Sequence, residues 1–322
     1  MLNKNSYVLI IGSSNMDLNI YSKRLPNPGE TVTGGVFRQF LGGKGANQSV
    51  ASVRSGAKTI FIGKIGVDSF GDQMISRLTN EGVDITHIIR DPNESSGVAF
   101  ILIDDKGENM ISVAPGANFK LTLDDIELHS EVIRNARCLV VQMEIPIEVI
   151  EKVFEIALQG NVIKILNPAP FKPIPPKVLK NIDIIVPNEG ELFLLYSSLG
   201  YSQLNRNDND IIFKVSKEIS KLGIKYIITT LGKKGCSIYL RQKEKNLLVP
   251  APKVEAVDTV GAGDCFIGVL ASKLSREESI INAVKYATVA ASIAVTRRGA
   301  QDSMPFLQEI EDKMNKLNID LD

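Results

Sequence analysis

The chain has 322 residues, 44% of them hydrophobic and 23% charged, which is typical of a packed globular protein. Its 37 basic and 37 acidic residues cancel and form no basic stripe, so no nucleic-acid partner is expected. Three scattered cysteines, Cys138, Cys236 and Cys265, lack metal-ligand spacing and suit a reducing compartment. The start is polar, and the first apolar run is too short for export or a membrane span. We therefore expect a cytoplasmic protein without a membrane partner.

Short β-branched runs alternate with longer stretches of helical periodicity along most of the chain. The expected strands are residues 8–11, 59–62, 139–141, 162–166, 182–186 and 226–230. Helical patterns between them include residues 147–158 and 211–222. This alternation predicts βαβ units, and hence an α/β fold around a mostly parallel sheet that is covered on both faces.

Two segments interrupt this rhythm. Residues 19–40 mix proline and glycine with threonine and valine, and residues 97–113 read as two apolar strands around a turn at 105–107. Because the first segment can pair with the second, we predict a small inserted antiparallel sheet that covers a ligand or joins a second subunit. A plain surface hairpin is the alternative. The expected division is an α/β core of residues 1–14, 41–96 and 115–322, with an inserted β lid of residues 15–40 and 97–114.

The most informative motif is residues 258–264, which read Asp-Thr-Val-Gly-Ala-Gly-Asp and precede an apolar helix-like run. A small-residue loop that opens a helix favours an anion, because backbone N–H groups and the positive end of the helix dipole converge there. Asp264 would repel a bound phosphate unless it had a chemical task. We interpret it as the base that takes a proton from a hydroxyl attacking a phosphoryl group. The alternative is a helix N-cap.

Glycines also open a helix at residues 42–47, which read Gly-Gly-Lys-Gly-Ala-Asn before a small-residue helix at 48–53. No Ser or Thr follows the lysine, so this is not a Walker A loop. Lys44 and Asn47 offer donors to a polyhydroxylated ligand, unless the lysine simply faces solvent. Just past the first strand, the segment 15–17 contains an asparagine and an aspartate that can grip vicinal hydroxyls or end the strand in an Asx-turn.

Polar residues follow three later strands. Glu144, Asn188 and Glu191 stand where contacts to Mg²⁺ or a sugar are expected, although each is also a common loop residue or first-turn helix acid. Residues 231–235 carry two lysines between glycines, and they either hold nucleotide phosphates or only form a hairpin into residues 237–240.

His87 and His129 lie in polar surroundings without a nucleophile motif, so we expect both at the surface. Base catalysis by histidine is therefore not expected, and this strengthens the interpretation of Asp264. The polar segment 202–210 is expected to be a solvated loop.

The combined motifs resemble the PfkB carbohydrate kinase family, and within it the ribokinases, over nearly the whole chain. The segments that match the family, in its order, are residues 15–17, 42–47, 66–71, 188–191 and 258–264. Those that resemble ribokinases in particular are residues 28–32, 42–48, 167–170 and 294–301.

The resemblance implies a doubly wound core with an inserted β lid that also forms a homodimer interface. It implies a reaction in which ATP phosphorylates D-ribose at the 5-hydroxyl, giving D-ribose 5-phosphate and ADP. By the same resemblance Asp264 is the base, and the backbone N–H groups of Gly261, Ala262 and Gly263 form the anion hole.

The remaining site residues are also implied by the resemblance. The sugar is held by Asn15, Asp17, Gly43, Lys44, Gly45, Asn47 and Glu144. The nucleotide is contacted by Asn188, Thr230, Leu231, Gly232, Lys233, Lys234, Gly235, Gly263 and Thr288. A monovalent cation, usually K⁺, is held at Asp258, Val260, Ala294, Arg297, Gly299 and Ser303, and Glu191 is tied indirectly to Mg²⁺.

One position departs from the pattern: Thr288 stands where many ribokinases carry a histidine or asparagine near the adenine. Three alternatives stay open. The first is a 2-deoxyribokinase, the second is another sugar or nucleoside kinase of the family, and the third is a non-catalytic sugar-binding sensor.

Overall fold

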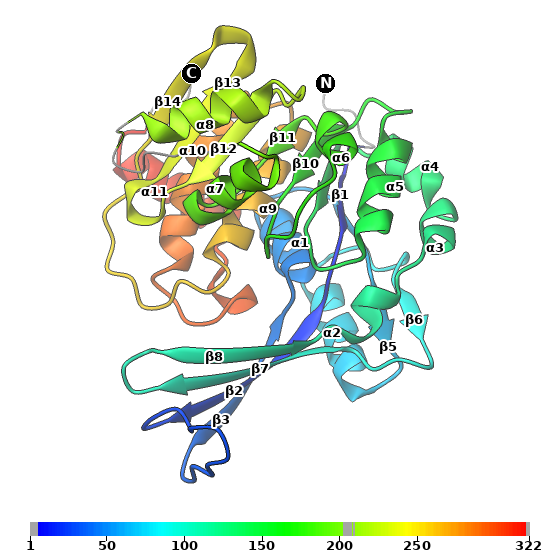
Figure 1. Ribbon diagram of the computed structural model, residues 1–322, viewed down its shortest axis with the longest axis vertical. Helices are drawn as coiled ribbons and strands as arrows, with labels where there is room; N and C mark the ends of the chain where they lie inside the picture. The colour runs from blue at the N-terminus through cyan, green and yellow to red at the C-terminus, as the bar shows by residue number, and fades with distance from the viewer. Residues whose placement is uncertain (1–5, 202–207, 209, 320–322) are drawn as a thin grey trace.

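The computed structural model describes residues 6–201, 208 and 210–319, so most of the predicted loop 202–210 lies outside the described residues. An eight-stranded sheet forms the body, in the order β14-β13-β12-β11-β10-β9-β1-β4 (Figure 1). In this sheet β12, β11, β10, β9, β1 and β4 pair in parallel, and β13 and β14 add an antiparallel edge. The bounds are β1 (Val8–Ile11), β4 (Thr59–Ile62), β9 (Cys138–Val141), β10 (Ile163–Leu166), β11 (Ile184–Ile185), β12 (Tyr226–Thr230), β13 (Cys236–Leu240) and β14 (Lys245–Val249). The predicted doubly wound, mostly parallel sheet is confirmed.

Helices cover both faces because successive strand residues point to opposite sides. In β1, Val8 and Ile10 pack into one hydrophobic core, and Leu9 and Ile11 pack into the other. The first core is completed by α1 (Lys44–Arg54), α9 (Ala262–Ser275), α10 (Ile280–Ala294) and α11 (Leu307–Lys316). The second is completed by α3 (Leu123–Glu127), α4 (Ser130–Asn135), α5 (Ile147–Ala157), α6 (Pro176–Lys180), α7 (Glu189–Ser198) and α8 (Ile211–Ser220). Short 3₁₀ turns are η1 (Gly116–Lys120), η2 (Gly232–Lys234), η3 (Arg241–Lys243) and η4 (Gln301–Ser303).

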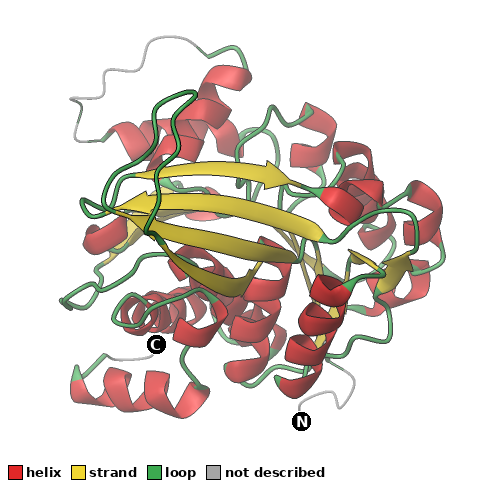
Figure 2. Cartoon of the chain, turned by 90° about the horizontal axis from the view of Figure 1, so that it is seen from below, coloured by secondary structure: helices red, strands yellow, loops and turns green. Residues whose placement is uncertain are grey.

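A second sheet extends from this body as an arm, and Figure 2 shows its strands spread across one side of the molecule. Its order is β3-β2-β7-β8, with bounds β2 (Asn15–Ser22), β3 (Val36–Gly42), β7 (Gly97–Asp104) and β8 (Asn109–Ala114). The sheet is mixed rather than antiparallel, because β2 and β7 pair in parallel. Both strands leave the body in the same direction, and β3 and β8 return. The predicted turn at 105–107 is confirmed.

Two smaller elements lie at the base of the arm. Strands β5 (Lys64–Gly66) and β6 (Ile89–Asp91) form a parallel ribbon, and α2 (Ser69–Asn80) follows β5. Within the described ranges no helix has the length and apolar character needed to cross a bilayer.

Helices α1 and α9 pack closely, and this contact positions the site. A Cβ added at Gly268 of α9 would lie 2.4 Å from the Gln48 carbonyl oxygen and 2.6 Å from the Ala51 Cβ. Helix α1 also begins at Lys44, four residues earlier than the expected helix 48–53, because Gly43 adopts a φ of 86° and its carbonyl accepts the Asn47 N–H. The side chains of the 42–47 motif therefore lie in the first turn of α1.

The two histidines expected at the surface lie together and are only partly exposed. His87 and His129 are half-buried, and their rings meet edge to face with centroids 5.2 Å apart. Burial, followed by the neighbouring His129, holds the pKa of His87 below its ordinary value, against an opposing effect of Asp84. The pair lies outside both cavities described below.

Candidate active site

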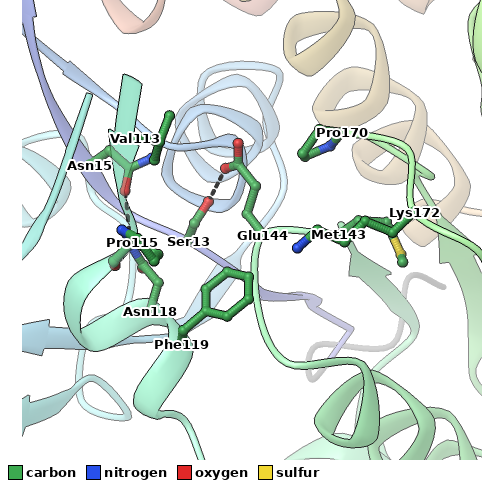
Figure 3. Close-up of a pocket in the computed structure, with 10 residues that line it drawn as sticks. All are labelled: Ser13, Asn15, Val113, Pro115, Asn118, Phe119, Met143, Glu144, Pro170 and Lys172. Carbon is green, nitrogen blue, oxygen red and sulfur yellow. Dashed lines mark hydrogen bonds between the residues drawn. The ribbon is translucent and has the colours of Figure 1, made fainter. Parts of the chain in front are cut away.

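Two cavities open at the carboxyl edge of the parallel strands. The smaller has a volume of about 230 Å³ and is shown in Figure 3. Its lining is Ser13, Asn15, Val113, Pro115, Asn118, Phe119, Met143, Glu144, Pro170 and Lys172. The larger, about 660 Å³, lies between β12, the loop before α9, and α10. Carboxyl edges of parallel sheets are where α/β proteins bind ligands.

Asp264 directly follows Gly263, which lines the larger cavity. It is the third residue of α9, so it is not the N-cap, a position that Gly261 occupies with a φ of 75°. Its side chain is 7% exposed. The Asn47 Nδ2 donates to Asp264 Oδ2 at 2.9 Å, and the Gln48 Nε2 donates to Oδ1 at 3.0 Å. Both carboxylate oxygens are thus held by amides, and each keeps a further lone pair for a ligand.

The backbone around Gly261 carries the donors expected of an anion site. Within the described residues, the N–H groups of Gly261, Gly263 and Asp264 have no hydrogen-bond acceptor. Ala262 differs, because its N–H donates to the Thr259 carbonyl in a long bond of 3.3 Å. A Cβ at Gly263 would meet nothing within 4 Å, so the backbone there faces open space in the larger cavity. These unpaired donors lie at the positive end of a 14-residue helix.

Asn47 can bind a ligand in addition to its hydrogen bond to Asp264. Its Oδ1 is buried and has no hydrogen-bond partner in the described part of the chain. An unpaired buried acceptor is costly, so it is expected to receive a donor from a bound ligand. A sugar hydroxyl that donates to it would lie beside the Asp264 carboxylate.

Lys44 is half-buried and faces several carboxylates. Burial acts to lower the pKa of Lys44, but the charges of its acidic neighbours, led by Asp264 and Glu144, raise it on balance. Its backbone N–H donates to Glu144 Oε2 at 3.1 Å. The same oxygen accepts the Ser13 hydroxyl, as Figure 3 shows. Glu144 is therefore fixed by main-chain and side-chain donors, with its carboxylate in the smaller cavity.

The pKa of the Asp17 carboxyl is shifted strongly from its ordinary value. Burial raises its pKa to about 7, Glu144 and Asp264 add to the rise, and Lys44 opposes it. The carboxylate lies against Gly42, where a Cβ would fall 2.3 Å from Asp17 Oδ2. Asp17 is in the third position of β2, so the Asx-turn interpretation is wrong.

Asn15 is oriented by a residue that sequence analysis did not single out. The Asn118 Nδ2 in η1 donates to Asn15 Oδ1 at 2.8 Å, and Asn118 Oδ1 accepts the Ser14 N–H at 3.0 Å. Because the Asn15 oxygen is occupied, its Nδ2 group is left to donate toward the cavity. A lone asparagine carries no sequence signal for this role.

Asn188 and Glu191 form a capping box at the start of α7. The Asn188 Oδ1 accepts the Glu191 N–H at 2.8 Å, and the Glu191 carboxylate accepts the Asn188 N–H at 2.8 Å. Burial raises the pKa of Glu191, and Asp264 adds to the rise against the lowering effects of the Asn188 N–H and Lys44. The structure thus confirms the helix-start alternative and still places the Glu191 charge within reach of Lys44 and Asp264.

Asp258 joins the loop before α9 to the segment after α10. Its Oδ1 accepts the Val260 N–H at 3.0 Å, and its Oδ2 accepts the Gly299 N–H at 2.9 Å. Two other residues predicted to hold the monovalent cation use their side chains elsewhere. The Ser303 hydroxyl donates to the Ala300 carbonyl, and the Arg297 guanidinium pairs with Glu309. Ala294 is buried, and its carbonyl accepts the Arg297 N–H.

The larger cavity brings together several of the residues predicted to contact a nucleotide. Those that line it are Thr230, Gly232, Lys233, Lys234, Gly235, Gly263 and Thr288. The hairpin from 231–235 into β13 is also confirmed. Sequence analysis missed other residues of the lining, which are Ala251, Pro252, Lys253, Val254, Ala256, Phe266, Ala291, Ser292 and Val295. Residues 251–256 are irregular and have no periodic signal.

A profile described as pfkB family carbohydrate kinase matches residues 5–307. The chain is 38% identical to the ribokinase of Staphylococcus aureus (strain COL), over 94% of this chain and 98% of that protein. It is 33% identical to the deoxyribokinase of Salmonella typhi, over 96% and 98%. The structure of Arabidopsis thaliana ribokinase complexed with ribose and ATP matches with a TM-score of 0.87 and 31% identity, over 95% and 98% of the two chains.

Proposed function

The chain belongs to the pfkB family of carbohydrate kinases, and on that premise we propose that it is a ribokinase, which transfers the γ-phosphoryl group of ATP to the 5-hydroxyl of D-ribose. The observation that carries this proposal is the buried Asp264 carboxylate at the start of α9. On one side it adjoins Gly263 of the larger cavity, and on the other it is bound to Asn47, in the same helical turn as Lys44. A sugar sensor without catalysis has no need of such a base.

The smaller cavity and the first turn of α1 are proposed to hold the sugar. Carboxylates accept hydroxyl protons and amides both donate and accept, which is the chemistry that a polyol requires. The proposed contacts are Asn15, Asp17, Gly43, Lys44, Gly45, Asn47 and Glu144.

The proposed chemistry needs little from the protein beyond positioning and charge stabilisation. Asp264 takes the proton of the sugar 5-hydroxyl while the hydroxyl oxygen attacks the γ-phosphorus of ATP. The bond between the γ-phosphorus and the oxygen that remains on ADP breaks. The N–H groups of Gly261 and Gly263 stabilise the charge on the transferring phosphoryl group, and Ala262 joins them if its long bond to Thr259 opens.

ATP is proposed to bind the larger cavity, where Lys233, Lys234 and Lys253 meet apolar surface. No cluster of three or more metal-ligating side chains occurs among the residues that the structure describes. This suits Mg²⁺, which usually keeps several waters and binds substrate phosphates with one or two carboxylates, and Glu191 is the proposed one. A bound Mg²⁺ would neutralise charge on the phosphates.

A K⁺ ion is proposed near Asp258. The residues present fit such an ion, because one carboxylate and neighbouring main-chain carbonyls are the oxygen ligands that a hard cation takes. Asp258 already joins the loop before α9 to Gly299. The proposed role of the ion is to fix the conformation of the loop before α9 without contacting the substrate.

The arm is proposed to act as a lid over the sugar and as a homodimer clasp. It exposes large apolar side chains, including Phe37, Phe100, Met110, Ile111 and Val113. By the strand register Phe37, Phe100 and Met110 lie on one face of the arm, and Ile111 and Val113 lie on the other. Exposed apolar surface marks interaction sites. A closed lid would also exclude water, which competes with the sugar hydroxyl for the phosphoryl group.

A coupled ADP-release assay over a panel of sugars, with and without K⁺, tests the proposal. D-ribose is expected to give the highest kcat/KM. A preference for 2-deoxyribose would favour the deoxyribokinase alternative, because that sugar lacks one of the hydroxyls that Asp17 is proposed to accept. ATP binding without ADP formation from any pentose would favour a sensor.

The role of Asp264 is tested by Asp264→Asn, which preserves the shape of the side chain. We expect ribose binding to persist while kcat falls on the order of 10²–10⁴-fold, the usual contribution of a general base. Near-normal turnover by this variant would refute the assignment.

A further inference from the structure

A series of buried side-chain amides connects the sheet to Asp264. Gln48 in α1 donates from Nε2 to Asp264 Oδ1 at 3.0 Å, and its Oε1 accepts from the Gln142 Nε2 at 2.7 Å. Gln48 and Gln142 are both 0% exposed. Neither residue lines the smaller or the larger cavity. Gln48 therefore contacts the proposed base, and Gln142 contacts Gln48, while neither residue lines a cavity.

The direction of these bonds is determined by the chemistry of the amide group. An amide has one donor end and one acceptor end. If the Gln48 amide turned over, its oxygen would face the Asp264 carboxylate and its NH₂ group would face the Gln142 donor. The Gln142 N–H thus selects the orientation in which Gln48 donates to Asp264.

Further bonds support the same orientation. The Gln48 Nε2 also donates to Asn167 Oδ1 at 3.3 Å, and the Asn167 Nδ2 donates to the Val186 carbonyl at 3.0 Å. The Gln48 amide therefore uses both of its N–H groups and its oxygen. Gln142, Asn167 and Val186 directly follow β9, β10 and β11, so the series is anchored at the ends of three adjacent parallel strands.

The fold makes room for this arrangement at one glycine. A Cβ at Gly12 would lie 1.9 Å from the Gln142 Oε1, so a larger residue would displace the Gln142 amide. Gly12 directly follows β1, which pairs with β9.

We propose that Gln142 and Gln48 are positioning residues for phosphoryl transfer: Gln142 fixes the amide of Gln48, and Gln48 aims the Asp264 carboxylate at the sugar hydroxyl. The inference rests on the proposed function, with Asp264 as the base. It assigns Gln142 a role in kcat although this residue touches neither substrate cavity. A purely structural role would instead lower stability and leave the turnover of folded enzyme unchanged.

The test measures kcat, the KM of D-ribose and the KM of ATP for Gln142→Leu, which removes the donor and preserves most of the volume. We expect kcat to fall roughly 10- to 100-fold, because the carboxylate loses its fixed donor. Both KM values are expected to stay within about twofold. Gln159→Leu is the matched control, since it makes the same exchange at an exposed residue after α5, and wild-type constants are expected.

Gln142→Glu supplies a second readout. The introduced carboxyl group can donate to the Gln48 Oε1 only when it is protonated, so the kcat of this variant relative to wild type should rise as pH falls from about 8 to 6. Comparison with wild type cancels the titration of the ionisable groups that face Asp264, which are Asp17 in β2, Lys44 in α1, Glu144 after β9 and Glu191 in α7. A structural role would not produce this dependence.

The outcomes separate the inference from the proposed function. If wild type does not phosphorylate D-ribose, the proposed function fails. If wild type does so and folded Gln142→Leu keeps its kcat, or loses kcat only with an equal rise in both KM values, the positioning role is overturned. If Gln142→Leu does not fold, Gln142→Glu decides: a flat or falling ratio of kcat values on acidification overturns the proposal.

Discussion

The affinity for D-ribose is predicted to fall as the solution is acidified through neutrality, because Asp17 must be ionised to accept two sugar hydroxyls. Burial raises the pKa of this carboxyl to about 7, with Glu144 and Asp264 adding to the rise. Above that pH the carboxylate is ready to accept. Below it the group carries a proton, and each pH unit removes about tenfold of the competent form.

The expected size follows from the fraction of enzyme that is competent to bind. With a pKa of about 7, roughly 90% of Asp17 is ionised at pH 8 and about 3% at pH 5.5. The apparent Kd for ribose should therefore be about 30-fold weaker at pH 5.5. Isothermal titration calorimetry without nucleotide measures this directly.

Two variants test the cause of the pH dependence. Lys44→Met removes the charge that opposes the rise, so the midpoint of the profile should move to higher pH. Asp17→Asn should bind ribose weakly with a flat profile, because nothing at that position titrates. A wild-type Kd that is constant from about pH 5.5 to 8, or one that tightens on acidification, would refute the reasoning.

Three further predictions concern packing and stability. Gly268→Val should destabilise the fold by about 1–3 kcal/mol in chemical denaturation, because its Cβ would meet the Ala51 Cβ at 2.6 Å; a variant as stable as wild type would show that α1 and α9 can separate freely. Asp68→Ala removes the N-cap of α2 and should cost about 1–2 kcal/mol at neutral pH. Burial acts to raise the pKa of Asp68, but hydrogen bonds from Ser96 and Gly71 lower it on balance in the folded state. The stabilisation is therefore present above the unfolded pKa, and the loss in Asp68→Ala should shrink only on acidification below about pH 4. Below about pH 6.5 the unfolded chain protonates His87 more readily than the folded chain, so wild type should lose stability there and His87→Gln should lose less; equal losses would contradict the assignment.

The body of the fold could be predicted because its signals are local. β12 begins and ends at the predicted residues 226 and 230, since a buried parallel strand reads as one continuous apolar run. The pairing of β2 with β7 could not be predicted in the same way. It joins segments about eighty residues apart, and no local pattern states which strand of one hairpin lies beside which strand of the other.

The site shows the same division. Asp264, Lys44 and Asn47 belong to glycine-rich loops that open helices, a pattern with a clear physical meaning in sequence. The capping box of Asn188 and Glu191 was also readable, because an Asn followed three residues later by Glu marks a helix start. Gln142 carried no signal, since its role depends on which strand ends beside α1.

If the proposed function holds, the distribution of charge around the site separates the position of a neutral sugar from that of a polyanion. The carboxylates of Asp17, Glu144 and Asp264 lie at the proposed sugar end, where Lys44 faces them and Lys172 also lines the smaller cavity. Hydroxyl donors are attracted there, whereas phosphates are repelled. The proposed nucleotide end carries lysines, including Lys233, and the positive end of α9. Gly263 lines the larger cavity and directly precedes Asp264. In the proposed arrangement, a phosphoryl group therefore meets backbone N–H groups that offset its charge at the point where Asp264 can receive the hydroxyl proton.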